Sequence, residues 1–181
     1  MTEQQQRHLV LIGFMGTGKS SVGRYLGQKT GLPVTDTDGE VEKKADMSIP
    51  QIFEEEGEAG FREREHEVLQ QVLGRRSQII TTGGGVVLRP DNVRLLREKG
   101  WVVALDASEQ ELTRRLSADR SRPLLTGDVR ERVARLKRER QGRYDFAHRK
   151  LDTTQMSPKE AAEWIWKEWK AFLSRSDGEG D

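Results

Sequence analysis

The sequence predicts an α/β fold, in which helices cover both faces of a parallel sheet and form three layers with it. Short apolar runs alternate with longer amphipathic segments along the 181 residues, as they do in folds of this class. Hydrophobic and charged residues each make up 34% of the chain, so a core can form beneath a strongly charged surface. We expect one domain over residues 1–175 and a disordered tail at 176–181.

Five segments have the length and composition of short strands. Glycine or acidic residues lie at the ends of the first three. The segments are His8–Ile12, Leu32–Asp38, Gln78–Thr82, Trp101–Ala107 and Lys150–Thr154. Loops that follow parallel strands meet at one edge of the sheet, so ligand-binding residues are expected there.

Helices are predicted between these strands from apolar residues at spacings of three and four. In the first helix Val22, Tyr25 and Leu26 share a face, and Gly31 begins the stop signal. Further helices are expected at Asp38–Asp46, Glu58–Leu73, Pro90–Lys99 and Val129–Arg143, with a final helix that packs through Trp164, Trp166 and Trp169. Capping boxes are expected at Ser48–Gln51, Ser108–Glu111 and Ser157–Glu160.

The composition argues against several kinds of site and partner. The chain has no cysteine, so it has no disulfide, cysteine zinc site or thiol nucleophile, and its three histidines are too scattered to predict a metal cluster. Its net charge of +1 argues against a nucleic-acid binder. The polar N-terminus resembles neither a signal peptide nor a membrane span. We therefore expect a cytoplasmic monomer with no membrane partner.

The segment "GFMGTGKSS" matches the phosphate-loop pattern G-x-x-x-x-G-K-[ST] between the first strand and the first helix. Glycines let backbone N–H groups face phosphate oxygens, and the helix N-terminus adds positive charge. A lysine at this position meets the β- and γ-phosphates, and the serine hydroxyl meets Mg²⁺. Pattern and context together favour a nucleoside triphosphate site over a simple turn. The residues concerned are Gly13, Gly16, Thr17, Gly18, Lys19, Ser20 and Ser21.

Two acids lie two positions apart at the end of the second strand. On extended backbone Asp36 and Asp38 would face the same way, where they could hold Mg²⁺-bound water and orient a hydroxyl nucleophile. Alternatively, they cap a helix in a solvated loop. The neighbouring phosphate loop favours the first interpretation.

Several arginines could serve an anionic ligand. For Arg62, which precedes Glu65 by three residues, the sequence alone favours an exposed charged face and a weak ion pair. Arg140 extends an apolar stripe, so its charge needs either an anionic ligand or an internal carboxylate, and both stay open. Arg115, Arg120 and Arg122 accompany a loop that ends in Gly127, and this segment, at about 116–128, has the composition of a movable lid. A nucleic-acid patch in this basic region is disfavoured because aromatic residues are sparse.

Three consecutive glycines, Gly83, Gly84 and Gly85, follow the third strand. They are either a flexible linker or a turn without side chains, against which a substrate can rest. Their place on the same rim as the phosphate loop and the acids favours the second interpretation.

Taken in order, these motifs resemble the shikimate kinase family, small kinases of the P-loop, nucleoside-monophosphate-kinase-like group. The resemblance covers the chain from His8 to the final helix. It rests on "GFMGTGKSSVGRYL", "DTD", "IPQIFEEEGEAGFREREHEVL", "TTGGG", "LDAS", "SRPLLTG" and the arginine four residues before Tyr144. It implies a five-stranded parallel sheet in the order 2-3-1-4-5 with a lid. It also implies transfer of phosphate from ATP, with Mg²⁺, to the 3-hydroxyl of shikimate in chorismate biosynthesis.

The resemblance further implies residue roles. Lys19, Asp38 and Arg122 would be catalytic, with Asp38 as the candidate base, and Ser20 and Asp36 would serve the metal. Arg115 and Pro158 would lie near the adenine, and Arg122 would meet the transferring phosphate. The implied substrate residues are Asp38, Phe53, Phe61, Arg62, Gly83, Gly84, Gly85 and Arg140.

The chain departs from the family pattern near Arg140. No proline stands between Arg140 and Tyr144, and the stretch from Tyr144 to Asp152 is shorter than in many relatives, so Arg143 stays an alternative for the substrate carboxylate. Two other functions remain open. One is another small-molecule kinase, such as a gluconate kinase, and the other is a catalytically silent nucleotide-binding module.

Overall fold

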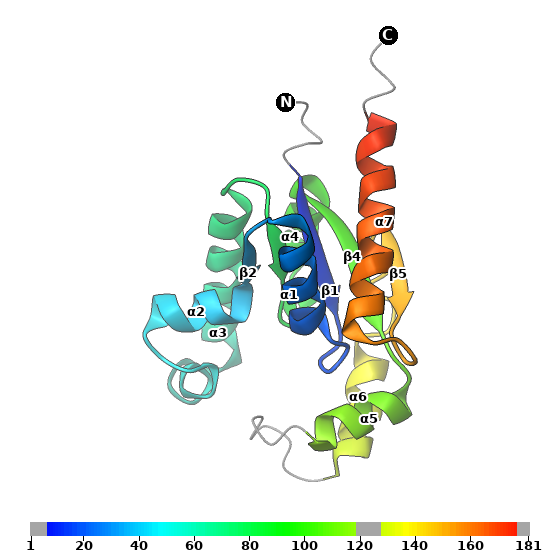
Figure 1. The fold of residues 1–181 in the computed structure, drawn as a ribbon. Coiled ribbons are helices and arrows are strands. Elements are labelled where there is room, and N and C mark those ends of the chain that lie inside the picture. Colours follow the sequence, from blue (N-terminus) through cyan, green and yellow to red (C-terminus); the bar gives the residue numbers. More distant parts are fainter. Residues whose placement is uncertain (1–6, 119–127, 177–181) are drawn as a thin grey trace.

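The computed structural model describes residues 7–118 and 128–176 (Figure 1). Its five strands form one parallel sheet in the order β2-β3-β1-β4-β5, which confirms the predicted α/β class and the strand order implied by the resemblance. The strands are β1 His8–Gly13, β2 Val34–Asp36, β3 Ile79–Thr81, β4 Gly100–Asp106 and β5 Arg149–Asp152.

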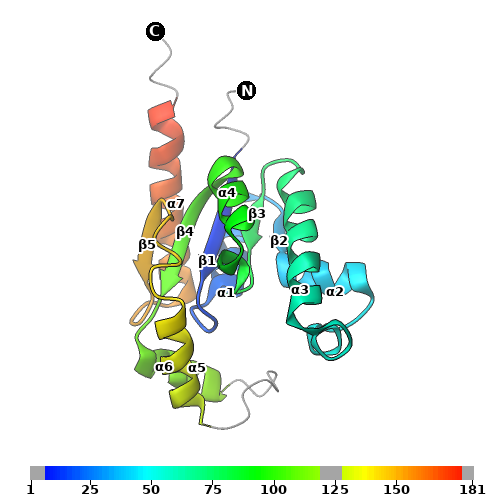
Figure 2. The ribbon, with the colours of Figure 1, turned by 180° about the vertical axis from the view of Figure 1, so that it is seen from behind.

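Helices cover both faces of the sheet. In Figure 1, α1 and α7 lie in front of the strands, and Figure 2 shows α4 on the opposite face with α3 beside it. The helices are α1 Lys19–Thr30, α2 Thr37–Ala45, α3 Ile49–Leu73, α4 Pro90–Lys99, α5 Glu109–Ala118, α6 Val129–Glu139 and α7 Pro158–Ser176. A short 3₁₀ helix spans Val86–Leu88. Within the described ranges, no helix is long and apolar enough to span a membrane.

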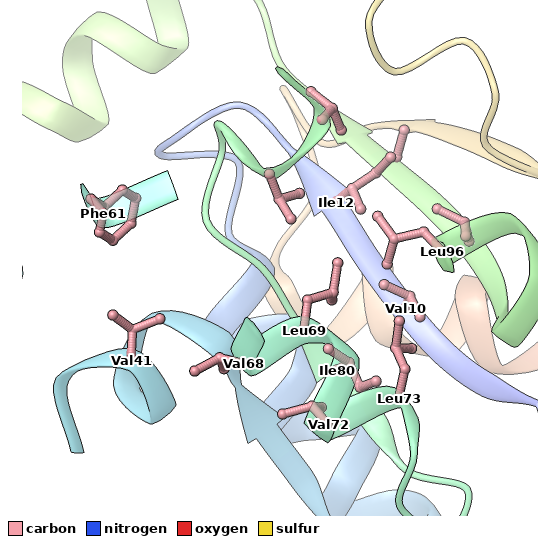
Figure 3. Packing of buried hydrophobic residues seen from close by; sticks show 14 of the residues in the cluster. Val10, Ile12, Val41, Phe61, Val68, Leu69, Val72, Leu73, Ile80 and Leu96 are labelled. Carbon is pink, nitrogen blue, oxygen red and sulfur yellow. The ribbon is translucent and has the colours of Figure 1, made fainter. Parts of the chain in front are cut away.

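The central strand β1 feeds both cores because successive side chains of a strand point to opposite faces. Val10 and Ile12 belong to the core beneath α3 and α4, whereas Leu9 and Leu11 belong to the core beneath α1 and α7. Figure 3 shows the first core, in which Leu69 of α3 lies near Ile80 of β3. On the other side Trp169 packs against Trp101, with ring centroids 5.3 Å apart, as the tryptophan-rich helix was expected to do.

Most predicted helix starts are confirmed. Both hydrogen bonds of the capping box at Ser48 form with Gln51, and those at Ser157 form with Glu160. The Ser108 hydroxyl accepts from the N–H of Glu111. The prediction that the Glu111 carboxylate would in turn accept from the N–H of Ser108 was wrong. Instead, the Glu111 carboxylate accepts from the Arg114 and Arg115 guanidinium groups, which are stronger donors than a neutral N–H.

Two predicted helical details were wrong. Tyr25 is 42% exposed, so the buried face of α1 runs through Val22, Gly23 and Leu26. By contrast, the start predicted at Ser48 and the helix predicted from Glu58 are both confirmed, because α3 begins at Ile49 and is broken at Gly57, whose φ of 72° lies in the left-handed region. The helix expected to reach Arg143 ends at Glu139, because the chain leaves helical geometry at Arg140 and enters a series of turns.

The carboxyl ends of β1, β2 and β3 lie on one rim of the sheet, as parallel pairing requires. The helices α5 and α6 lie beyond this rim (Figure 1). They enclose a smaller apolar cluster that includes Phe14 of the phosphate loop, Leu112 and Val133. The fold therefore packs the phosphate loop against the helices that flank the predicted lid, and the acidic motif at the end of β2 lies on the same rim of the sheet.

Candidate functional site

The phosphate loop has the backbone that its glycines predict. Gly13, Gly16 and Gly18 all have left-handed φ values, of 139°, 79° and 95°, which other residues adopt only with strain. A side chain at Gly13 would also collide with the carbonyl oxygen of Leu105. The Lys19 ammonium donates to the carbonyls of Gly13 and Phe14, at 2.8 Å each, so it lies at the centre of the loop. Gly18 caps α1 without a side chain, which leaves the first N–H groups of the helix facing an incoming ligand.

A cavity of about 590 Å³ opens beside this loop. It is lined by Gly16, Thr17, Gly18 and Ser21 of the loop region, by Arg115 of α5, and by the segment Thr153–Pro158. Its size and its position at a helix N-terminus suit the nucleoside part of a nucleotide. The nucleotide residues predicted in three separate parts of the chain therefore converge in one place.

Arg115 is fixed at the mouth of this cavity by backbone and side-chain acceptors. Its guanidinium donates to the carbonyls of Gly16, at 3.2 Å, and Thr153, at 2.7 Å. The buried Thr153 hydroxyl lies 3.1 Å from the Thr17 carbonyl and 3.0 Å from that of Asp106. Thr153 thus joins the ends of β4 and β5 to the phosphate loop.

The two acids do not share an extended strand end, and that prediction was wrong. Asp36 ends β2 and caps α2, where its Oδ1 accepts from the N–H of Gly39 at 3.0 Å and its Oδ2 from the Thr81 hydroxyl at 2.7 Å. Asp38 lies in the first turn of α2, because helix formation begins at Thr37. The two acids are therefore placed by different elements, and Asp38 turns toward the glycine motif.

Each glycine of the triple-glycine motif lies against one charged side chain. A Cβ added to Gly83 would lie 2.6 Å from Asp38 Oδ1, and one added to Gly84 would lie 2.9 Å from Arg140 Nη1. A Cβ on Gly85 would lie 2.7 Å from Arg62 Nη1. None of the three glycines has a left-handed φ, so room rather than backbone conformation requires glycine here. The motif gathers one carboxylate and two guanidinium groups from α2, α3 and the end of α6.

Arg62 and Glu65 form a buried ion pair, so the exposed pair favoured by the sequence was wrong. Glu65 is 1% exposed, and its Oε2 accepts from Arg62 Nη1 at 2.8 Å. Burial raises the pKa of Glu65 above its ordinary value of 4.5, while Arg62 opposes that shift. Glu65 Oε1 and Arg62 Nε are buried without a hydrogen-bond partner, which leaves polar capacity for a ligand.

Arg140 faces inward although it lies just beyond α6. Its guanidinium carbon is 5.4 Å from the centre of the Phe14 ring, and its Nη1 is buried without a hydrogen-bond partner. Tyr144 holds the turn that Arg140 faces, because its hydroxyl donates to the Gly84 carbonyl at 2.8 Å. Burial raises the pKa of Tyr144, so its hydroxyl stays a donor at neutral pH. Arg143 is exposed, so of the two candidates for the substrate carboxylate Arg140 is the one that faces inward.

Phe53 and Phe61 form an apolar pair on the two halves of α3, with ring centroids 4.8 Å apart. The Arg62 guanidinium lies over the Phe61 ring, 5.1 Å from its centre, which fixes the cation against an aromatic face. These rings supply an apolar wall next to the charged groups.

Arg122 lies outside the described residues, as does most of the lid expected at 116–128, and so does nearly all of the tail.

Ser20, Asp36 and Thr81 line one open recess beside α1, and their oxygen atoms are of the hard type that Mg²⁺ prefers. The residues present therefore fit a magnesium ion, with Asp36 already oriented by two hydrogen bonds.

Sequence reasoning missed three contributors to the site. Glu65 lies on the buried face of α3 with Phe61 and Leu69. Its spacing of four residues from each of these apolar residues is the sequence signal that could have revealed it. Tyr144 was noted only for its spacing from Arg140, and Thr153 not at all, because both act through bonds to backbone that is distant in the sequence.

Comparison with known proteins identifies the family to which this chain is similar. The shikimate kinase family model matches residues 15–170. The shikimate kinase of Pelotomaculum thermopropionicum is 44% identical over 160 residues, which are 88% of this chain and 93% of that protein. The structure of shikimate kinase from Acinetobacter baumannii in complex with shikimate has a TM-score of 0.86 and 34% identity, with 95% of this chain and 96% of that chain covered. For the shikimate kinase structure from Aquifex aeolicus the TM-score is 0.80 at 33% identity, with 92% and 98% covered. The chain therefore belongs to the shikimate kinase family.

Proposed function

We propose that this chain transfers the γ-phosphoryl group of ATP to the 3-hydroxyl of shikimate and so serves aromatic amino-acid biosynthesis. One observation carries the proposal: Asp38, Arg62 and Arg140 converge on the three glycines, on the rim that also holds the phosphate loop. A small hydroxylated carboxylate needs this combination, because cations must neutralise its carboxylate while an acceptor orients its hydroxyls. Family membership supports the same substrate.

In this proposal the two guanidinium groups grip the substrate carboxylate. Arg62 and Arg140 lie against adjacent glycines, and each has a buried guanidinium nitrogen without a hydrogen-bond partner. Phe53 and Phe61 cover the apolar side of the ring. Gly84 and Gly85 bring backbone close to the substrate, and we infer that the N–H of Gly85 faces it.

Asp38 orients the reacting hydroxyl and accepts its proton. The hydroxyl oxygen forms a bond to the γ-phosphorus while the bond from that phosphorus to the β–γ bridging oxygen breaks, which releases ADP. Lys19, the phosphate-loop N–H groups and Arg122 offset the charge of the transferring group. Ser20 would hold Mg²⁺ directly and Asp36 through water, and the ion would neutralise phosphate charge when bound. Arg115 and Pro158 would hold the adenine in the cavity beside the loop.

We also infer a cytoplasmic protein that acts as a monomer, because the described residues of the site come together within a single copy of the chain. The lid at about 116–128 would close over ATP and exclude water from the reaction.

The function is tested by the release of ADP from ATP and Mg²⁺ in the presence of shikimate, gluconate or nucleoside monophosphates. We expect stimulation by shikimate alone, and loss of that stimulation in Lys19→Ala. Stimulation by gluconate would support another small-molecule kinase instead. No stimulation by any acceptor, with ATP still bound, would support a catalytically silent module.

A further inference from the structure

We propose that His66 and Asn92 are positioning residues that set the distance between α3 and the triple-glycine turn, and thereby the affinity for the substrate carboxylate. The inference rests on the proposed function. Neither residue belongs to the set of groups that would touch substrate or nucleotide. They form a hydrogen-bonded link beside the contact between Arg62 and Gly85.

The link runs through a fully buried asparagine. Asn92 is 0% exposed, and its Nδ2 donates to the Val86 carbonyl at 3.0 Å. Its Oδ1 lies 2.7 Å from His66 Nδ1 on α3. A carbonyl can only accept, so the amide nitrogen must face Val86 and the amide oxygen must face His66. His66 therefore carries a proton on Nδ1 and donates it to Asn92.

Both ends of this link lie next to substrate-binding groups. Val86 directly follows Gly85, and its N–H donates to the Gly83 carbonyl at 3.3 Å, so the glycine turn and the 3₁₀ helix are one unit. His66 lies one helical turn after Arg62, and residues at this spacing share a helix face. The link therefore joins α3 to the glycine-turn unit at a point one helical turn from the contact between Arg62 and Gly85.

The close packing of Arg62 makes this distance matter. Its guanidinium lies against Gly85 with no space for even one methyl group. Its Nη1 also donates to Glu65 Oε2 at 2.8 Å. If α3 withdrew from the turn, Arg62 would follow Glu65 and leave the substrate carboxylate. Binding groups need placement within about 0.5 Å, so a small shift is enough to weaken binding.

A second tie between the same elements provides a matched control. Arg89, which precedes α4, donates to Glu63 of α3 at 2.8 Å, and the Glu63 side chain is 67% exposed. Exposed pairs of this kind contribute little, because water and side-chain entropy offset the attraction. The buried link through Asn92 should therefore govern the spacing, and the exposed pair should not.

The test compares His66→Leu, His66→Asn and Glu63→Gln with the unchanged chain. We expect His66→Leu to raise the shikimate KM about fivefold, the effect of one lost hydrogen bond, with the ATP KM unchanged. His66→Asn should recover the wild-type value, because its amide nitrogen can occupy the place of Nδ1. Glu63→Gln should leave both KM values unchanged. The dissociation constant of shikimate, measured without nucleotide, should follow the same order.

Several outcomes would overturn the proposal. An unchanged shikimate KM in His66→Leu would do so, and so would an equal rise in the ATP KM, which indicates a merely structural role. Failure of His66→Asn to recover affinity would also count against the link. The variants are placed at His66 because it is only half-buried, whereas a substitution of the fully buried Asn92 could prevent folding. Wild-type inactivity with shikimate would instead refute the proposed function on which the inference rests.

Discussion

Replacing Gly85 with alanine tests whether the triple-glycine turn exists to make room for charged side chains. The φ of Gly85 is −95°, which alanine adopts without strain, so any effect must come from the added methyl group. That group would lie 2.7 Å from Arg62 Nη1 and 2.8 Å from its guanidinium carbon. Carbon atoms in contact stay about 3.5 Å apart, so the guanidinium must retreat by about 0.7 Å.

This retreat has a calculable effect on binding. The bond from Arg62 to Glu65 is 2.8 Å long, and a shift of this size stretches or misaligns it. A hydrogen bond to a charged group contributes about 1.5–3 kcal/mol, and each 1.4 kcal/mol is a factor of ten. Since the bond that Arg62 would make to the substrate carboxylate is of the same kind, we expect the dissociation constant of shikimate to rise at least tenfold.

The assay is calorimetric titration with shikimate, supported by the KM values for both substrates. Gly74→Ala is a matched control, since Gly74 has helical φ and ψ and its Cβ would meet its nearest neighbours at 3.5 Å. We expect Gly74→Ala to bind shikimate normally, and Gly85→Ala to keep its KM for ATP. Wild-type shikimate affinity in Gly85→Ala would refute the reasoning.

Three other variants test separate parts of the site and fold. Asp38→Asn should lower kcat by about a hundredfold or more while ATP binding persists, because a neutral amide cannot accept the proton; full turnover would contradict the base assignment. Burial raises the folded-state pKa of Glu65 above the unfolded value of 4.5, so around and above pH 4.5 the native state binds more protons than the unfolded state. The free energy of unfolding should therefore fall as the pH rises from 4.5 toward the folded-state pKa. Urea unfolding should show this slope in the wild type but a weaker one in Glu65→Gln, and identical slopes would contradict the burial argument. His148 Nδ1 accepts from the N–H of Val102 at 3.0 Å, and burial lowers its pKa below 6.5. Stability should therefore fall as pH drops through 6.5 and below, and less steeply in His148→Asn, which keeps an acceptor without titrating; equal pH profiles would argue against this role.

The sequence was sufficient for the features that depend on local chemistry. The phosphate loop, the capping residues Ser48 and Ser157 and the end of α4 at Lys99 each follow from a few neighbouring residues. Alternating apolar runs also predicted the parallel sheet, because both of its faces must be buried.

Features that depend on distant partners could not be predicted in the same way. The Arg62–Glu65 pair looks like an exposed helical pair until α3 is packed against the glycine turn. Asp38 turns inward only because helix geometry begins at Thr37, one residue earlier than expected. Arg140 was identified by an apolar stripe that implied a helix as far as Arg143, yet α6 ends at Glu139 and Arg140 lies just beyond it.

Because of the packing at the glycine turn, the residues that can be accepted at Gly85 depend on which residue occupies position 62. At Gly83, Gly84 and Gly85 the first atom of any side chain would meet the charged end of a residue from another element. Their backbone conformations do not require glycine. A related chain that shortened or lost Arg62 would thus free the position of Gly85 to vary, whereas no change at Gly85 is neutral while Arg62 remains. The two positions should therefore change together in evolution, and the arginine should change first.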